Sequence, residues 1–170
     1  MNGITRWFPR TKVVQVNIGQ ALTDRGKGAQ EREYGADFLG VLDINLSDFS
    51  VKKGFLSQAK IIEPDRVFPR REYERMHQQC EEMLWITPDA FVFIYSTQGI
   101  RVIPAISIVS ATHCNPHELY SRSLARFFEE HFQSFIGDRR LGAPNIDVLE
   151  VVQREYRARA ALYLSAEWIG

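Results

Sequence analysis

The spacing of apolar residues along the chain changes between the period of a strand and the period of a helix. Residues 12–18 alternate apolar and polar positions and predict a first strand. Two longer apolar segments follow at residues 35–44 and 53–61, and the polar stretch 45–50 between them carries turn-forming residues. These two segments predict a β-hairpin, around which the rest of the chain is organised.

Apolar residues recur at helical spacing soon after this hairpin, from Tyr73 to Leu84. Farther along, near-continuous apolar runs of strand length predict central strands. The predicted elements are a short helix over 29–34, a helix over 70–86, strands over 90–95 and 100–106, and helices over 116–136 and 146–168. Together they predict an α/β fold in one domain over residues 1–170.

The polar residues of the hairpin gather at one end of it. Asp37 opens the first strand, while Gln58 and Lys60 lie two residues apart near the end of the second and share one face. Antiparallel pairing brings the start of one strand opposite the end of the other. Burying a carboxylate, an amide and an ammonium is costly unless they serve one another or a bound ion. This placement predicts a functional site, with a purely structural Asp–Lys pair as the alternative.

An Asp that opens a strand, a hairpin and then Gln58-Ala59-Lys60 on the next strand resemble the PD-(D/E)XK nuclease superfamily. The Gln in the triplet is similar to a variant found in methyl-directed restriction endonucleases and in effector domains of anti-phage systems. The resemblance covers residues 25–110. It implies a restriction-endonuclease-like fold, in which helices flank a mixed central β-sheet, and a metal-dependent endonuclease of restriction or phage defence.

The resemblance also implies a role for each residue of the site. Asp37, Gln58 and the carbonyl of Ala59 would bind a divalent metal, and Glu31 from the preceding helix would complete the site. Lys60 would orient the attacking water and stabilise the developing negative charge. Mg²⁺ is the expected ion, with Mn²⁺ as a substitute, because the neutral Gln58 stands where the commonest pattern has an acidic residue. For the same reason a catalytically inactive module for nucleic-acid binding or protein assembly stays an alternative.

The composition limits the classes of partner. Hydrophobic residues make up 45% and charged residues 25% of the chain, which is typical of a soluble globular protein. No segment has the ~20 apolar residues needed to span a bilayer, and the N-terminus lacks the apolar core of a signal peptide. We therefore expect no membrane association and a cytoplasmic location. The formal net charge of +0 argues against nonspecific coating of nucleic acid.

The basic residues are mostly arginines, 16 against 5 lysines, and four of them lie within residues 66–75. Two explanations remain open for this cluster. The arginines pair with glutamates of the same helix at helical spacing, or they contact DNA phosphates beside the site.

DNA is the expected substrate, and RNA is not excluded. Because no sequence-reading module is recognisable, we expect a homodimer or a partner protein to supply specificity, with the aromatic helix around Phe127 as the candidate dimer interface. His113 and His117 lack a second pair of ligands and are interpreted as structural rather than as a zinc site. Cys80 and Cys114 are interpreted as reduced thiols.

Overall fold

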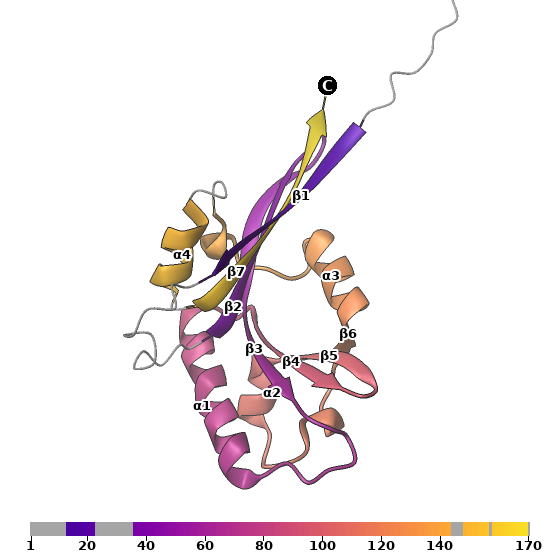
Figure 1. Ribbon diagram of the computed structural model, residues 1–170, viewed down its shortest axis with the longest axis vertical. Helices are drawn as coiled ribbons and strands as arrows, with labels where there is room; N and C mark the ends of the chain where they lie inside the picture. The colour runs from indigo at the N-terminus through magenta and orange to yellow at the C-terminus, as the bar shows by residue number, and fades with distance from the viewer. Residues whose placement is uncertain (1–12, 23–35, 144–147, 157, 170) are drawn as a thin grey trace, which may run out of the picture.

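The computed structural model describes residues 13–22, 36–143, 148–156 and 158–169. Its centre is a seven-stranded mixed sheet with the strand order β1-β7-β2-β3-β4-β5-β6 (Figure 1). The strands are β1 (Val13–Leu22), β2 (Ala36–Asn45), β3 (Ser50–Ile61), β4 (Ala90–Ser96), β5 (Gly99–Pro104), β6 (Arg122–Ser123) and β7 (Ala158–Ile169). The helices are α1 (Arg70–Ile86), α2 (Ala105–Ser110), α3 (Leu124–Phe132) and α4 (Leu149–Glu155), with 3-10 helices η1 (Pro116–Glu118) and η2 (Arg139–Leu141).

The predicted hairpin and the helix after it are confirmed. β2 and β3 pair antiparallel from Phe38↔Ser57 to Asn45↔Ser50, and α1 covers the predicted residues 70–86. The chain then returns through α1 to β4, which pairs parallel with β3. Such a parallel return requires a crossover connection, and α1 supplies it. The predicted short helix over 29–34, which includes Glu31, lies outside the described residues.

The predicted helix over 146–168 is wrong beyond residue 155. Ala158–Ile169 forms β7, which lies between β1 and β2 and pairs antiparallel with the former and parallel with the latter. Ala161 and Tyr163 are buried, whereas Arg159 is exposed. The segment is rich in alanine and leucine, which favour a helix. Two neighbouring strand edges satisfy its backbone on both sides, and this tertiary pairing overrides the local preference.

The predicted elements between residues 100 and 136 are also revised. β5 ends at Pro104, and the short helix α2 replaces the end of the predicted strand. The predicted helix over 116–136 is interrupted, because Leu119 has extended backbone dihedral angles after η1. A new helix, α3, begins only where the side chain of Ser123 accepts the N–H of Arg126 and caps it.

The two faces of the sheet carry separate cores. Buried residues of α1, α2 and α4 pack on one face, and α3 packs on the other through an aromatic cluster. Phe127 of α3 is fully buried there, and its ring lies edge-on to Phe55, Phe91 and Phe93. Phe127 itself therefore belongs to the core, and a dimer interface on the aromatic helix around it stays a prediction. None of the helices in the described ranges is long and apolar enough to cross a membrane.

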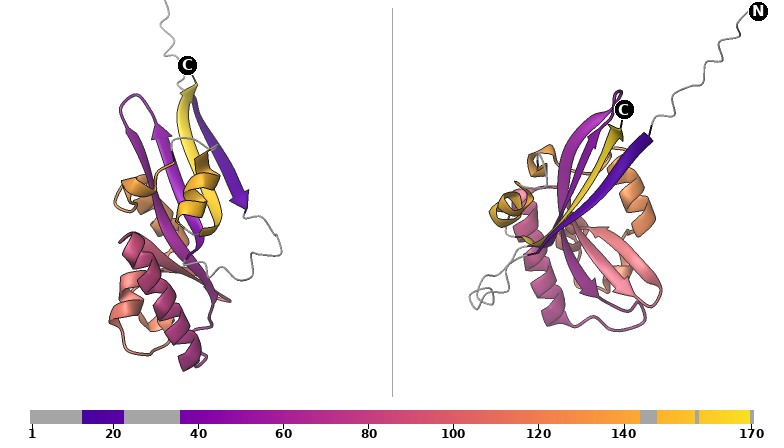
Figure 2. Two further views of the ribbon diagram at one scale, coloured as in Figure 1. Left: turned by 90° about the vertical axis from the view of Figure 1, so that its left-hand side faces the viewer. Right: turned by 45° about the horizontal axis from the view of Figure 1, so that its top comes forward.

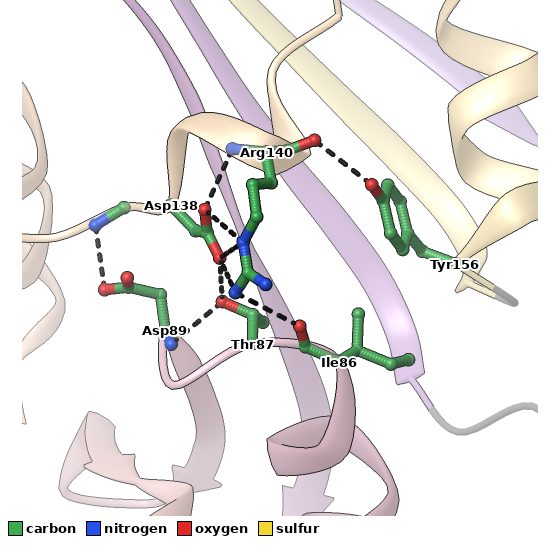
Figure 3. A network of polar contacts seen from close by, with 7 residues as sticks. Ile86, Thr87, Asp89, Asp138, Arg140 and Tyr156 are labelled. Atoms are coloured by element: carbon green, nitrogen blue, oxygen red, sulfur yellow. Dashed lines mark hydrogen bonds and ion pairs between the residues drawn. The ribbon is translucent and has the colours of Figure 1, made fainter.

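The connection over residues 136–142, here called the clasp, joins several elements (Figure 3). Asp138 exchanges two backbone hydrogen bonds with Gly54 and so extends the ladder of β3 where β4 does not reach. Its carboxylate accepts the hydroxyl of Thr87, at 2.9 Å, and binds the guanidinium of Arg140, which holds its pKa down at about 2. A Cβ at Gly54 would lie 2.7 Å from the carbonyl oxygen of Gly40, so this close approach requires glycine.

A lysine that the sequence pattern placed in the hairpin is buried against the clasp. Lys53 is 1% exposed, and its Nζ donates to the carbonyl of Ile136 at 2.6 Å. Burial lowers the pKa of Lys53 to about 8, although Asp89 opposes the shift. Gly137 has a φ of +119°, and a Cβ there would lie 2.8 Å from the lysine side chain.

Candidate functional site

The candidate site lies where β2 and β3 stop pairing. Their ladder ends at Phe38↔Ser57, and the next residue toward the start of β2 is Asp37. Its Oδ2 accepts the backbone N–H of Ala59 at 2.7 Å. The carboxylate thus satisfies a donor of β3 that no backbone group of β2 reaches. The structure therefore brings Asp37 against the middle residue of the Gln58-Ala59-Lys60 triplet.

The side chains of Gln58 and Lys60 lie on the face of the sheet that α1 covers. In the parallel register, Gln58 is opposite Val92 and Lys60 is opposite Ile94, two residues of the core under α1. Leu39 belongs to the same core, so Asp37, two residues earlier in β2, shares this face. Gln58 is 1% exposed, whereas Asp37 and Lys60 are half-buried. The site is therefore closed on the Gln58 side and open at the end of the two strands.

Lys60 is held by α1. Its Nζ donates to Oε1 of Gln79 at 2.8 Å. Burial lowers the pKa of Lys60, the carboxylate of Asp37 opposes this shift, and the guanidinium of Arg75 adds to it. The pKa of Lys60 thus responds both to a carboxylate on β2 and to a guanidinium on α1.

Gln79 is a residue that the sequence analysis missed. It occupies a position on α1 three residues after Met76 and one residue before Cys80, which are both fully buried, so its side chain borders the core beside Lys60. The signal that would have found it is the helical spacing of polar positions next to the buried stripe. That signal has meaning only once the strand that faces the helix is known.

The arginine cluster at residues 66–75 is divided between two environments. Arg70 pairs with Glu74 at 2.9 Å on the exposed surface of α1, as one of the two predictions expected. Arg66, Arg71 and Arg75 have no carboxylate within 4.0 Å in the part of the chain that the structure describes. Surface pairing therefore accounts for Arg70 alone, and Arg75 lies beside the candidate site.

The oxygen atoms at the end of the two strands fit a hard divalent cation. Oδ2 of Asp37 is bound to Ala59, whereas its Oδ1 takes part in no hydrogen bond among the described residues. The N–H and the C=O of one strand residue point to the same side of the strand. The carbonyl of Ala59 therefore points toward β2 and Asp37, as its N–H does. Mg²⁺ prefers such oxygen ligands, and one or two carboxylates with several waters suffice. In the described residues no three His, Cys, Asp or Glu side chains gather for a metal, and Glu31 lies outside them.

Other polar groups on the hairpin have structural partners. Asp43 shares the pleat face of Asp37, but its Oδ2 accepts the hydroxyl of Tyr163 at 2.7 Å and pairs with Lys52 at 3.2 Å. Outside the hairpin, the two histidines considered for a zinc site also have structural partners. The ring nitrogens of His113 and His117 contact the backbone carbonyls of Phe68 and Ile62 at 2.9 and 2.8 Å, respectively. These contacts tie the segment after α2 to the segment before α1.

Comparison of the chain with models of protein families, with curated proteins and with solved structures gave no match. The geometry of the site is thus the basis for its interpretation.

Proposed function

We propose that the protein is a cytoplasmic, metal-dependent nuclease of restriction-endonuclease-like fold that hydrolyses phosphodiester bonds, with DNA as its substrate. The observation that carries the proposal is the contact of the Asp37 carboxylate with the peptide of Ala59, one residue from an ammonium that is held in place. A carboxylate, a carbonyl and an ammonium in this order match the site that the sequence resemblance implies. A role in restriction or phage defence follows from that resemblance alone.

Asp37 and the carbonyl of Ala59 would hold Mg²⁺, with Gln58 and Glu31 as the remaining candidate ligands. The bound ion would supply a water of lowered pKa and neutralise charge on the phosphoryl oxygens. The chain itself contributes Lys60, whose ammonium stands at the open end of the site and stabilises negative charge that develops on a bound phosphodiester. Gln79 fixes the direction of that ammonium, and the half-buried setting strengthens its electrostatic effect.

Gln58 affects the metal preference of the proposed enzyme. A neutral amide adds no charge to the site, so among the candidate ligands Asp37, Gln58 and the carbonyl of Ala59 only Asp37 is anionic. Fewer anionic ligands bind a divalent cation less tightly. We therefore expect cleavage to be stronger with Mn²⁺ than with Mg²⁺, since Mn²⁺ binds a given set of ligands more strongly than a harder ion does.

The experiment compares the purified protein with Asp37→Asn and Lys60→Met on plasmid and single-stranded DNA, with Mg²⁺, Mn²⁺ or EDTA. Asn keeps an oxygen that can accept the Ala59 N–H, and Met keeps the length of the lysine side chain, so both changes spare the fold. We expect cleavage that needs metal and falls about 100-fold or more in each variant. Lys52→Met, in the same strand but paired with Asp43 away from the site, and Asp48→Asn, an exposed residue of the β2–β3 turn, are the matched controls.

Unchanged cleavage in Asp37→Asn and Lys60→Met would refute the proposed site. DNA binding by all the proteins without cleavage in any metal would instead identify a catalytically inactive module of nuclease fold. The same preparations, assayed on RNA of the same sequence, decide between the two nucleic acids.

A further inference from the structure

The strand β1 ends the sheet on one side. It pairs with β7 from Val13↔Ile169 to Leu22↔Ala160, and the register is continuous over all ten residues. Figures 1 and 2 show β1 at the edge of the sheet, beside β7. No other segment of the described residues pairs with β1. The edge therefore presents a row of backbone N–H and C=O groups that is ten residues long.

Within the described residues, β1 lacks the features that usually protect an edge strand against pairing. Edge strands are normally short, charged, bulged or interrupted by proline. The sequence of β1, VVQVNIGQAL, contains no charged residue and no proline, and its register with β7 contains no bulge. The opposite edge of the sheet behaves in the usual way, because β6 has only two residues and includes Arg122.

We infer that the outer edge of β1 pairs antiparallel with β1 of a second copy of this chain, so that one sheet runs through a twofold dimer. Antiparallel pairing of a strand with itself is a closed, isologous contact. A twofold axis perpendicular to the sheet does not exchange the two faces of the sheet, so a given residue lies on the same face in both copies. Residues of the same parity are therefore opposite one another in every register that this symmetry permits.

The residue types of β1 suit this symmetric pairing. The even positions 14, 16 and 18 are Val, Val and Ile, which pair well with one another across strands. The odd positions 15 and 17 are Gln and Asn, which are polar but uncharged residue types. No like charges meet, because β1 has none. A different partner chain has no such requirement for an uncharged strand, so self-pairing explains the composition best.

The test is the mass of the full chain in solution, measured by light scattering or sedimentation at protein concentrations from about 1 to about 100 μM. This range detects a dimer with a Kd of about 10 μM. We expect the unchanged protein to approach twice its 19.6 kDa. A lysine variant, Gln15→Lys with Asn17→Lys, should be monomeric, because like charges then lie opposite one another. A glutamate variant, Gln15→Glu with Asn17→Glu, should be monomeric too, and an equal mixture of the two should dimerise again.

The matched control adds the same two charges elsewhere on the surface. Phe132 and Phe135 are the exposed aromatic residues at the end of α3, with exposures of 43% and 78%. Phe132→Lys with Phe135→Lys should leave the dimer intact. If this control becomes monomeric while the lysine variant stays dimeric, the aromatic surface is the interface and the inference is wrong. A monomer at every concentration of the unchanged protein also refutes it, whatever its activity on DNA.

Hydrogen exchange on the unchanged chain serves as a second measurement, in case the charged variants fail to fold. In the dimer, the β1 amides that face away from β7 are protected, and dilution should speed their exchange. Rapid exchange of these amides at the highest concentration would overturn the inference. Neither measurement depends on the proposed nuclease activity.

Discussion

At the scale of single residues, the direction of the Lys60 ammonium depends on one hydrogen bond, from Nζ to Gln79 at 2.8 Å. Gln79→Leu should lower the cleavage rate about tenfold or more, since a hydrogen bond to a charged group contributes about 1.5–3 kcal/mol. The substrate concentration for half-maximal rate should change little, because the residue acts through Lys60. The measurement is steady-state cleavage of a defined duplex.

Gln78 provides the matched control on the same helix. It is exposed and donates to Glu82 at 3.1 Å rather than to a residue of the site. Gln78→Leu should leave the rate unchanged, while Gln79→Glu should restore part of it, because a carboxylate also accepts from the ammonium. Equal losses in Gln78→Leu and Gln79→Leu would point to the stability of α1 instead.

Some residues of the site could be predicted from the sequence, and others could not. Asp37, Gln58 and Lys60 were predictable because the strand period and the direction of a hairpin are local properties. Gln79 required knowledge of which helix face meets β3. No local pattern predicts the burial of Lys53, because it follows from the clasp, more than 80 residues later in the chain. The functional roles of Asp37, Gln58, Lys60 and Glu31 all stay predictions.

At the scale of elements, the correct predictions were those in which a local pattern and a tertiary environment agree. α1 has apolar residues at helical spacing, and the residues buried in it are Tyr73, Met76, Cys80 and Met83. β7 has no such agreement, because its alanines and leucines suit either period. Only the edges of β1 and β2 decide in favour of a strand, and these edges belong to distant parts of the chain.

The burial of Phe127 on α3 has a consequence for the stability of the protein. Phe127→Ala should lower the free energy of unfolding by about 3–5 kcal/mol, because it leaves a cavity among the rings of Phe55, Phe91 and Phe93. Phe135→Ala should change it by less than about 0.5 kcal/mol, since the ring is 78% exposed. Urea unfolding of both variants gives the comparison. Similar losses for the two would contradict the packing of α3 described above.

At the scale of the whole molecule, the fold joins segments that are far apart in the sequence. β7, the last strand, lies between β1 and β2, and the clasp contacts β3, the end of α1 and α4. Contacts of high sequence separation carry no local signal, so the strand order could not be predicted. They also couple distant groups to the stability of the entire domain, and His131 is the clearest case.

His131 should make the protein less stable in acid. Its ring is fully buried, and because a carbonyl only accepts, Nδ1 carries the proton in the 3.0 Å contact with Ile136. Burial lowers the pKa of His131 from 6.5 to about 4, and the charge of Lys53 adds to this shift, whereas the Ile136 hydrogen bond opposes it. Between these pH values the unfolded chain binds a proton that the folded chain does not. The free energy of unfolding should therefore fall by up to about 3 kcal/mol as the pH decreases from about 6.5 to about 4.

The comparison with His131→Phe isolates this effect in urea unfolding over the same pH range. Phe fits among the aromatic neighbours of His131 but has no titrating group, so the variant should lose less stability in acid than the unchanged protein. Asp138 and Lys53 do not interfere, because their pKa shifts change the stability in other pH ranges. The range is between about 2 and 3.8 for Asp138, and between about 8 and 10.5 for Lys53. Parallel curves for the two proteins would mean that His131 takes up its proton as readily in the folded protein as in the unfolded chain. That result would contradict the lowered pKa of the buried ring.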